Sequence, residues 1–377
     1  MSELRNLGMK DKILLITGDF FPTRGGISTL LFELCHKIPR LVVLTKKTDS
    51  DEEFDSLQNI AIRRIKTLNI YLQLFPFIIN ALKIVKKQRI DKLFCGQLLV
   101  AGLVGYTIHR WLKKPYLVYV YGPEFQEHKL WRPLLKLILS HAALLLTISD
   151  FAKVQLLKQN IPASRITVFT PGVDTVRFNP KLDADKIRQR HNLHRKRVLL
   201  TISRLEANKG VDKMINLMPE ILRKYPDTVY LIVGKGPEEK RLKKLAAKMA
   251  KENIIFTGEV PDEELPLYYA AGDIFVLLTR EVPSKGFVEG FGIVFLEASA
   301  CGKPIIAGRA GGSVEAVEDR ISGLVVNPLD DEEILSAIEK LLADDNLRAE
   351  LGLKGRERVE NKFTWEKKRK QFIDLIS

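Results

Sequence analysis

Two cations and two acids have the residue types and spacing to hold a charged ligand. Arg204 and Lys209 stand five residues apart in the loop TISRLEANKG, and Glu289 and Glu297 stand eight apart in EGFGIVFLE. A guanidinium and an ammonium group at the end of a strand suit a diphosphate. A carboxylate can accept hydrogen bonds from two sugar hydroxyls. The four residues are therefore candidates for binding a phosphorylated sugar, although surface cations and solvated acids are the simpler alternative.

The glycines around Glu289 predict a turn followed by a helix. In TREVPSKGFVEGFG the helix is expected to begin near Phe291 or Gly292. Backbone amides at a helix N-terminus favour an anionic group. Glu297 would then lie one to two turns inside the helix, where it could reach a ribose diol at the other end of the same ligand.

A second glycine pair follows the first predicted strand. Gly25 and Gly26 stand in GDFFPTRGGISTLLFEL, just before an apolar helical pattern that begins near residue 27 or 28. Such a turn favours a phosphate or the hydroxyls of a sugar phosphate, with a flexible turn as the alternative. The segment is neither GxGxxG nor a Walker A sequence. Because no GxGxxG follows either first strand, a dinucleotide dehydrogenase is disfavoured.

Short apolar runs separated by amphipathic stretches predict the strands that position these loops. Most are continuous runs of Val, Ile and Leu, which is typical of parallel strands buried on both faces. The first half has runs at 12–18, 41–45, 92–96, 116–122, 143–149 and 166–172. The second half has runs at 198–204, 229–236, 254–260, 274–279, 303–308 and 323–328. The alternation predicts an α/β protein with two Rossmann-like doubly wound domains, whose natural ligand site is a cleft at the carboxyl ends of the strands.

The polar segment FNPKLDADKIRQRHNLHRKR indicates the domain boundary, since a new apolar strand follows it directly. The predicted division is an N-terminal Rossmann-like domain over 1–185, a C-terminal Rossmann-like domain over 186–360 and a last segment over 361–377.

The charge is uneven. The net charge of +14 lies entirely in residues 1–190, which hold 30 Lys and Arg against 16 Asp and Glu. This excess indicates an anionic partner, either a membrane surface or nucleic acid, unless the cations serve solubility alone. No basic motif is interleaved with aromatic residues, so nucleic acid binding is not expected.

Two apolar stretches in this half are candidate membrane-surface helices. The longest, 68–85, is interrupted by polar residues and proline and does not reach the length of a spanning helix. A core helix with a basic exposed face, or a helix lying on a membrane surface, are its two interpretations. KLWRPLLKLIL (129–139) is the second candidate.

Neither cysteine nor acidic spacing indicates a metal. Cys35, Cys95 and Cys301 are far apart, and no signal peptide is apparent, so a reduced cytoplasmic setting is expected. The DxD patterns at 49–51 and 183–185 fall in predicted polar linkers and are interpreted as solvated acids. No His and Cys cluster indicates zinc.

Together these motifs resemble the retaining glycosyltransferases of family 4, which have the GT-B fold. The resemblance runs through YGPEF (121–125), TISDF (147–151), PGVDTVRF (171–178), the Arg204/Lys209 and Glu289/Glu297 pairs, IIAGRAGGSVEAVEDRISGLVVNP and FTWEKK. Within the family, GFVEGFGIVFLEASACGKPIIAGRAGGSVEAV is most similar to phosphatidylinositol mannosyltransferases and related GDP-mannose enzymes.

The resemblance implies that 1–185 is the acceptor-side domain, that 186–360 binds the nucleotide sugar and that a C-terminal helix over 361–377 packs back on the first domain. It also implies a role for each matching position. Arg204 and Lys209 would bind the donor diphosphate, Glu289 would hold hydroxyls of the transferred sugar, and Glu297 would bind the ribose. The remaining donor-binding positions would be Gly25, Gly26, Lys235, Gly236, Gly258, Val260, Gly290, Phe291, Gly292 and Ile293.

One position departs from the family pattern. Tyr121 stands where many members have a histidine, so a histidine-based role is in doubt. Tyr121 and Glu124 are both assigned to the acceptor side. For Glu124, a structural role is the alternative interpretation.

The expected activity is transfer of a hexose, with mannose preferred, to a lipid or glycan acceptor in cell-envelope glycoconjugate synthesis. The donor would be a GDP- or UDP-sugar, no metal would be needed, and the protein could lie peripherally on the cytoplasmic face of the membrane. Front-face attack is the expected mechanism. A nucleotide-sugar epimerase of the same fold and a non-catalytic sugar-nucleotide-binding protein are the alternatives.

Overall fold

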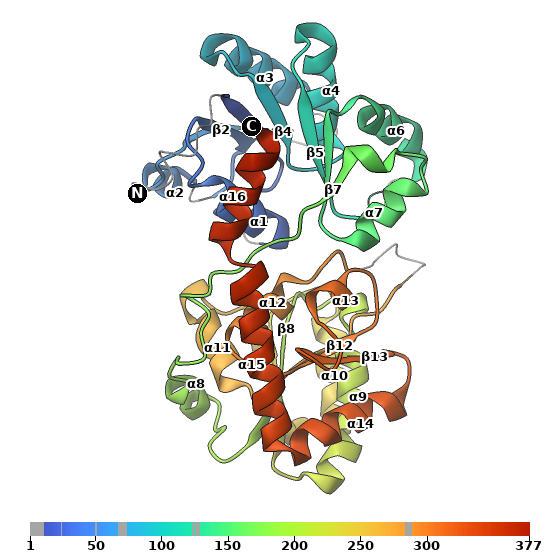
Figure 1. Ribbon diagram of the computed structural model, residues 1–377. Helices are drawn as coiled ribbons and strands as arrows, with labels where there is room; N and C mark the ends of the chain where they lie inside the picture. Colours follow the sequence, from blue (N-terminus) through green and yellow to red (C-terminus); the bar gives the residue numbers. More distant parts are fainter. Residues whose placement is uncertain are drawn as a thin grey trace. The chain divides into compact units, whose positions relative to one another are not determined.

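The chain forms two compact units. The computed structural model describes residues 11–23, 25–49, 51–66, 74–122, 124, 129–282 and 289–377 (Figure 1). Unit 1 consists of Met1–Pro171 and Trp365–Ser377, and unit 2 consists of Gly172–Thr364. The chain therefore passes between the units at 171/172 and at 364/365, whereas the sequence suggested boundaries at 185/186 and 360/361.

In the described part of unit 1, seven strands form one parallel sheet in the order β3-β2-β1-β4-β5-β6-β7. The strands are β1 (Ile13–Ile16), β2 (Leu41–Lys46), β3 (Ala61–Ile65), β4 (Lys92–Cys95), β5 (Tyr116–Val120), β6 (Leu144–Thr147) and β7 (Ile166–Val168). The helices are α1 (Gly26–Cys35), α2 (Asp51–Ser56), α3 (Leu74–Gln88), α4 (Val100–Leu112), α6 (Arg132–His141), α7 (Asp150–Leu157) and α16 (Trp365–Ile376). Helices α3, α4 and α6 cover one face, and α1 packs beside α16 on the other (Figure 1).

In the described part of unit 2, six parallel strands follow the order β10-β9-β8-β11-β12-β13. The strands are β8 (Arg197–Ile202), β9 (Thr228–Val233), β10 (Ile254–Gly258), β11 (Ile274–Leu277), β12 (Ile305–Gly308) and β13 (Gly323–Val326). The helices are α8 (Asp185–Arg190), α9 (Val211–Lys224), α10 (Glu239–Met249), α11 (Leu265–Ala271), α12 (Ile293–Ala300), α13 (Ser313–Ala316), α14 (Asp331–Ala343) and α15 (Asp345–Lys362). Counted from its first strand, the second sheet runs 3-2-1-4-5-6, the doubly wound Rossmann order, and the first sheet has the same order with a seventh strand added. This confirms the predicted fold of the two halves.

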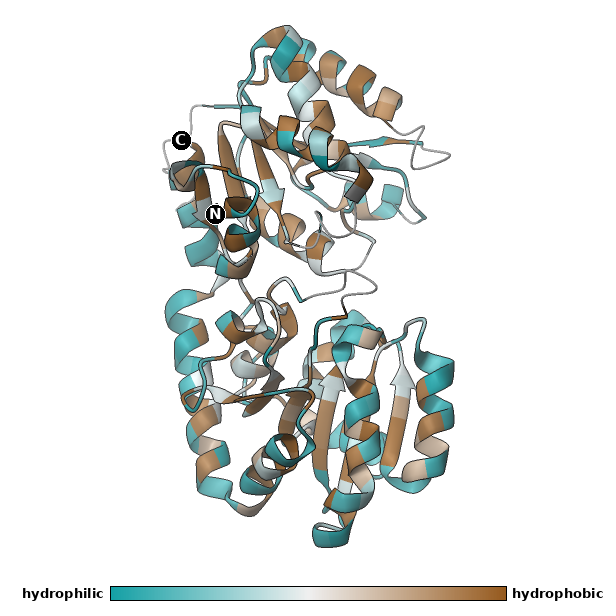
Figure 2. Cartoon of the chain, turned by 90° about the vertical axis from the view of Figure 1, so that its right-hand side faces the viewer, coloured by the Kyte–Doolittle hydropathy of each residue, from teal (hydrophilic) through white to brown (hydrophobic). Residues whose placement is uncertain are grey.

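Each sheet is buried on both faces, as the continuous apolar runs predicted. The burial pattern of β1, β5, β9 and β11 contains only buried residues. Figure 2 shows hydrophobic residues along the strands and hydrophilic residues on the outward faces of the helices. Burying one Val, Leu or Ile side chain stabilises the fold by about 1.5–3 kcal/mol, so these two cores hold the loops at the strand ends in place.

Helix α16 is part of unit 1 although it follows unit 2 in the chain. The Phe372 ring lies 5.0 Å from the Phe94 ring and 5.7 Å from the Phe169 ring. The Lys368 ammonium donates to Thr170 Oγ1 at 2.6 Å, and Arg369 donates to the Glu33 carbonyl at 2.9 Å. The last helix thus closes one face of the first sheet.

The acid at position 51 is not solvated, contrary to the interpretation of the first DxD pattern. Asp51 is 3% exposed. Its carboxylate accepts the Thr48 amide at 3.0 Å and lies 3.8 Å from the Arg64 guanidinium. Arg64 also donates to Asp55 at 2.8 Å. Asp51 was misjudged because the strand that carries Arg64 was not predicted.

Helix α3 contributes to the core of unit 1, as the first interpretation of the 68–85 stretch predicted, although residues 68–73 lie outside the described part. Its buried side chains are Phe77, Ala81, Ile84 and Val85. Its exposed side chains include Phe75, Ile79, Lys83, Lys86 and Lys87. Among the described residues, no helix combines the length and apolar character needed to cross a membrane.

Candidate functional site

The loop after the first strand of unit 2 carries both predicted cations. It leads from β8 through the short turn Ala207–Lys209 to α9. Gly210 closes the turn with φ 67°, and a Cβ at this position would lie 2.1 Å from the Leu278 carbonyl oxygen. This close approach requires glycine and places the turn directly on the chain that leaves β11.

Lys209 and Glu289 form an ion pair although they are 80 residues apart in the sequence. Lys209 Nζ lies 2.5 Å from Glu289 Oε2, and the two side chains are 17% and 13% exposed. The Glu289 carbonyl accepts the Gly312 amide at 2.9 Å, which fixes the backbone of the acid. The structure thus brings together a cation and an acid that the sequence analysis singled out separately.

Arg204 lies apart from this pair. Its side chain is 72% exposed, and its Nε lies 3.1 Å from Glu206 Oε1. An exposed pair of this kind contributes little to stability. The guanidinium is therefore available to a ligand at small energetic cost, while Lys209 is already held in place.

The glycine-rich segment after Glu289 leads into α12, as predicted. The helix begins at Ile293, and Gly292 precedes it with φ 89°. A Cβ on Gly292 would lie 2.6 Å from the Phe295 ring, so only glycine fits this turn. Phe291 is buried, whereas Gly290, Gly292 and Ile293 are partly exposed.

Glu297 has a partner that the sequence did not reveal. Tyr269 Oη donates to Glu297 Oε2 at 2.6 Å. Burial raises the pKa of the Glu297 carboxyl, and the Tyr269 hydrogen bond and the positive charge of Arg177 act against that rise. Arg177 itself pairs with Asp262 at 2.8 Å. Glu297 therefore lies in a partly apolar environment where its ionisation depends on these neighbours.

The loops after β9 and β10 lie beside the β8 loop. A Cβ on Gly236 would lie 2.3 Å from the Leu205 carbonyl oxygen, and the Leu205 amide donates to Lys235 O at 2.9 Å. Gly258 has φ 73°, and its carbonyl accepts the Gly234 amide at 2.8 Å. Lys235 is exposed and Val260 is partly buried. The candidates from Arg204 to Val260 thus lie at or after the carboxyl ends of three neighbouring strands, β8, β9 and β10, whereas the candidates from Glu289 to Glu297 lie between β11 and α12 or on α12 itself.

In unit 1, α1 begins at Gly26, one residue before its predicted start. Gly25 precedes the helix in an extended conformation, and Ser28 Oγ donates to its carbonyl at 3.0 Å. A Cβ on Gly26 would meet no atom within 4 Å. The space beside this helix N-terminus is open, so packing within the described part of the chain does not require the glycine.

The two predicted acceptor-side residues are engaged in local structure. The Glu124 oxygens accept the Tyr121 and Gly122 amides, each at 2.6 Å. Tyr121 Oη donates to the Gly96 carbonyl at 2.8 Å, and its ring stacks on Tyr119. Burial raises the pKa of Tyr121 well above its usual value. These contacts favour the structural role of Glu124, while an acceptor role for either residue stays a prediction.

A polar cluster that the sequence analysis missed lies at the switch point of the first sheet. Gln97 Nε2 donates to Asp19 Oδ2 at 2.5 Å, and Gln97 Oε1 accepts the Gly18 amide at 2.8 Å. Lys46 Nζ lies 3.4 Å from Asp19 Oδ1, and these two side chains are about one third exposed, at 36% and 38%. The three residues follow or end β1, β4 and β2, so their position relative to the strand ends could have identified them.

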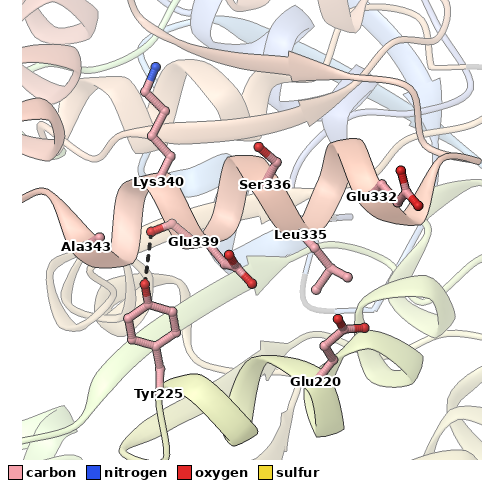
Figure 3. Close-up of a pocket in the computed structure, with 8 residues that line it drawn as sticks. All are labelled: Glu220, Tyr225, Glu332, Leu335, Ser336, Glu339, Lys340 and Ala343. Carbon is pink, nitrogen blue, oxygen red and sulfur yellow. Dashed lines mark hydrogen bonds between the residues drawn. The ribbon is translucent and has the colours of Figure 1, made fainter.

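Two hollows on the surface of the described residues lie away from these clusters. One, of about 490 Å³, is lined by α9 and α14, where Tyr225 Oη donates to the Glu339 carbonyl at 3.5 Å (Figure 3). Another, of about 410 Å³, lies beside β13 and includes Arg309 and Arg320. Neither includes a predicted site residue. Within the described ranges, no group of three or more His, Cys, Asp or Glu side chains is placed to hold a metal ion.

Two family models match the chain. "Glycosyl transferases group 1" matches residues 183–358, and "Glycosyltransferase Family 4" matches residues 24–177. A GDP-mannose-dependent alpha-(1-6)-phosphatidylinositol monomannoside mannosyltransferase of Mycolicibacterium smegmatis is 33% identical over 97% of this chain and 98% of its own length. A GDP-mannose-dependent monoacylated alpha-(1-6)-phosphatidylinositol monomannoside mannosyltransferase of Corynebacterium glutamicum is 31% identical over 94% and 95%.

Solved structures share the architecture. Alr3699/HepE of Anabaena in complex with UDP superposes with a TM-score of 0.83 at 20% identity, covering 97% of this chain and 99% of that one. Sucrose-phosphate synthase of Thermosynechococcus elongatus gives 0.80 at 23% identity, covering 97% and 98%. At these identities the likeness is one of fold, and it confirms the predicted GT-B class.

Proposed function

Because the chain belongs to the family 4 glycosyltransferases, with a group 1 domain over residues 183–358, we propose that it transfers mannose from GDP-mannose to a lipid-linked acceptor. The Lys209–Glu289 ion pair carries the proposal, since it places a cation for a diphosphate beside a carboxylate for sugar hydroxyls. The similar enzymes of M. smegmatis and C. glutamicum are named for GDP-mannose and for a phosphatidylinositol mannoside, which supports this donor and this acceptor class.

On the donor side, Lys209 and Arg204 would bind the diphosphate. Negative charge develops on the leaving phosphate as the bond to C1 breaks, and a preformed cation stabilises that charge most strongly in a site that excludes water. Lys209 is held by its ion pair with Glu289, and the exposed Arg204 would close on the ligand. The amides around Gly290 and Gly292 would add hydrogen-bond donors to the diphosphate.

Glu289 would orient the transferred sugar and not attack it. Its carboxylate is bound to Lys209, and hydrogen bonding to sugar hydroxyls fits that state better than nucleophilic attack on C1. We therefore propose retention through front-face attack. The acceptor oxygen forms the new bond to C1 on the face that the diphosphate leaves, and the acceptor proton passes to an oxygen of the departing phosphate.

Glu297 would bind the ribose of the nucleotide. A carboxylate that already accepts one hydrogen bond from Tyr269 has lone pairs left for a diol. The loops at Lys235, Gly236, Gly258 and Val260 would border the base, because they lie at the ends of β9 and β10, the two strands on one side of β8.

On the acceptor side, we propose the Asp19–Gln97–Lys46 cluster as the site that binds the acceptor head group. An acid, an amide and a cation at a switch point suit a polyol that carries a phosphate. The excess positive charge of the first half and the exposed Phe75 and Ile79 of α3, followed by lysines, support peripheral binding to an anionic membrane on its cytoplasmic face.

A panel of nucleotide sugars tests the donor. GDP-mannose, GDP-glucose and UDP-glucose would each be scored by thermal shift and by transfer to a phosphatidylinositol mannoside, without added metal and with a chelator. GDP-mannose should give the largest shift and a product with the anomeric configuration of the donor. Inverted product would exclude retention, and an epimerised nucleotide sugar formed without acceptor would establish the epimerase instead.

Sedimentation with liposomes tests the acceptor surface. Vesicles with anionic lipids should retain the protein, and retention should fall as salt rises because exposed cations are screened. Equal binding of the protein to neutral and anionic vesicles, or no binding to either, would contradict the proposed membrane contact.

A further inference from the structure

Arg280 binds the backbone of the turn that carries Lys209. Arg280 Nε donates to the Ala207 carbonyl at 3.0 Å, and its own amide donates to the Asn208 carbonyl at 2.8 Å. Its Nη2 contacts both carboxylate oxygens of Asp212 at 2.9 and 2.8 Å. The Arg280 and Asp212 side chains are 20% and 19% exposed, so solvent screens this pair only in part.

These bonds hold the turn from both ends. Ala207 and Asn208 precede Lys209, and Asp212 lies in the first turn of α9 just after it. Between them, Gly210 rests against Leu278, two residues before Arg280. The backbone from which Lys209 extends is thus fixed before, at and after the lysine by one short segment that follows β11.

The same segment leads towards the partner of Lys209. Residues 281 and 282 follow Arg280, and the chain reaches Glu289 after a stretch outside the described residues. The chain that follows β11 is therefore connected to the Lys209 turn twice, by Arg280 and by the ion pair of Glu289 with Lys209. A lysine side chain has four rotatable bonds, so its direction depends on a fixed base.

We propose that Arg280 and Asp212 are positioning residues that fix the Lys209 ammonium where the donor diphosphate departs. This inference rests on the proposed function, because the role of Lys209 at the diphosphate is part of it. A displacement of about 1 Å in a group that contacts the reacting atoms can reduce turnover by about 100-fold. Loss of the contacts of Arg280 with Ala207 and Asp212 would therefore lower turnover by displacing Lys209, without Arg280 contacting the ligand.

The matched variants are Arg280→Lys, Asp212→Asn and the control Arg241→Gln. A lysine at 280 keeps the charge but lacks the planar fork that reaches a carboxylate and a carbonyl together. Arg241 lies 3.6 Å from the same Asp212 carboxylate and also pairs with Glu238, so its loss alters Asp212 without touching the turn. Arg280→Lys and Asp212→Asn should each lower kcat with GDP-mannose by about tenfold, and Arg241→Gln by less than about twofold.

A double-mutant cycle on GDP affinity separates positioning from a general structural role. Lys209→Met and Arg280→Lys should each weaken GDP binding measured by calorimetry, and the double variant should be no weaker than Lys209→Met alone. Additive losses, a wild-type kcat in Arg280→Lys, or an equal loss in Arg241→Gln would each overturn the inference. Melting temperatures establish that the compared variants are folded. Asp212→Asn tests the same Arg280–Asp212 contact by changing the acid and not the arginine.

The cycle also tests the premise. If Lys209→Met weakens GDP and Arg280→Lys does not, the positioning role fails and the proposed function stands. If Lys209→Met leaves both GDP affinity and turnover unchanged, the role of Lys209 in the proposed function fails, and the positioning role fails with it.

Discussion

The two units share one strand order but differ in the side chains that their loops carry at the strand ends. In unit 2 the loops after β8 and β11 carry opposite charges that pair with little exposure, as Lys209 does with Glu289 and Arg280 with Asp212. In unit 1 the corresponding loops after β1 and β4 carry Asp19 and Gln97, joined by one hydrogen bond that includes a neutral amide. The same switch point therefore supports two different sets of side chains.

This difference indicates that the strand-end loops of unit 2 are better suited than those of unit 1 to stabilise a charge that changes during the reaction. Charged pairs held in place suit a group whose charge changes during the reaction. A partly exposed amide, carboxylate and ammonium suit a ligand that is recognised and not transformed at that point. The comparison predicts that substitutions at the switch point of unit 2 will lower turnover, whereas substitutions at the switch point of unit 1 will weaken acceptor binding.

The largest effect is expected at Lys209. Lys209→Met should lower kcat with GDP-mannose by about 100-fold or more, because a cation at the leaving phosphate is lost. Lys213→Met is the matched control, since Lys213 lies four residues later, in α9, and pairs with Asp331. Steady-state kinetics of both variants makes the comparison, and equal losses would show that the position of the cation does not matter.

The next effect separates the two glutamates. Glu289→Gln should lower turnover by roughly tenfold to 100-fold and leave GDP affinity within about threefold, whereas Glu297→Gln should mainly weaken GDP itself. Calorimetry with GDP and kinetics with GDP-mannose measure the two quantities. A trapped glycosyl-enzyme in Glu289→Gln, or equal loss of GDP affinity in both variants, would contradict the assignment of sugar and ribose to different acids.

A smaller effect is expected at the switch point of unit 1. Asp19→Asn should raise the KM for the lipid acceptor by about tenfold and leave GDP affinity unchanged, because one charged hydrogen bond to the acceptor is lost. Asp150→Asn, at the first turn of α7, is a control of the same chemistry elsewhere in unit 1. A loss of GDP affinity in Asp19→Asn would mean that the two switch points are not separate in function.

The smallest effect concerns pH. Burial raises the pKa of Glu297, and the Tyr269 hydrogen bond lowers it. Ribose hydroxyls donate to the ionised carboxylate, so GDP affinity should fall as pH drops through this raised pKa. Tyr269→Phe removes the lowering contact and should shift that fall to higher pH, while Glu297→Gln should abolish it. Calorimetry across the acidic range would show these shifts, and identical profiles in all three proteins would contradict the ribose assignment.

The ionisation of Glu297 also affects stability, with a sign that can be checked. Because its folded pKa lies above the unfolded value, the unfolded chain loses this proton at a lower pH than the folded protein. The folded state is then destabilised as pH rises above the unfolded pKa. Glu297→Gln should remove this loss in unfolding experiments without nucleotide.

Every strand predicted from an apolar run is present. Among the described residues one strand, β3, was not predicted, and its sequence shows the reason. β3 has the sequence AIRRI, with arginines at 63 and 64, and lies at the edge of its sheet. A buried parallel strand is apolar throughout, but an edge strand needs only one covered side. Sequence periodicity therefore identifies the centre of such a sheet better than its margin.

The candidate site could be predicted one residue at a time but not as contacts. Lys209 and Glu289 were identified from their positions after strands, yet their pairing depends on how β8 and β11 lie side by side. The Tyr269–Glu297 hydrogen bond joins α11 to α12, and no spacing in the sequence indicates it. Glu124 differs, because an acid two and three residues after Gly122 and Tyr121 is within reach of their amides by local geometry alone.

The position of α16 has a consequence for synthesis of the protein. Unit 2 is one continuous stretch, Gly172–Thr364, inserted between two parts of unit 1. On the ribosome, unit 2 is complete before Phe372 emerges to cover Phe94 and Phe169. Part of one face of the first sheet, beside α1, therefore stays uncovered until the rest of the protein has been made, although the strands of this sheet are translated first.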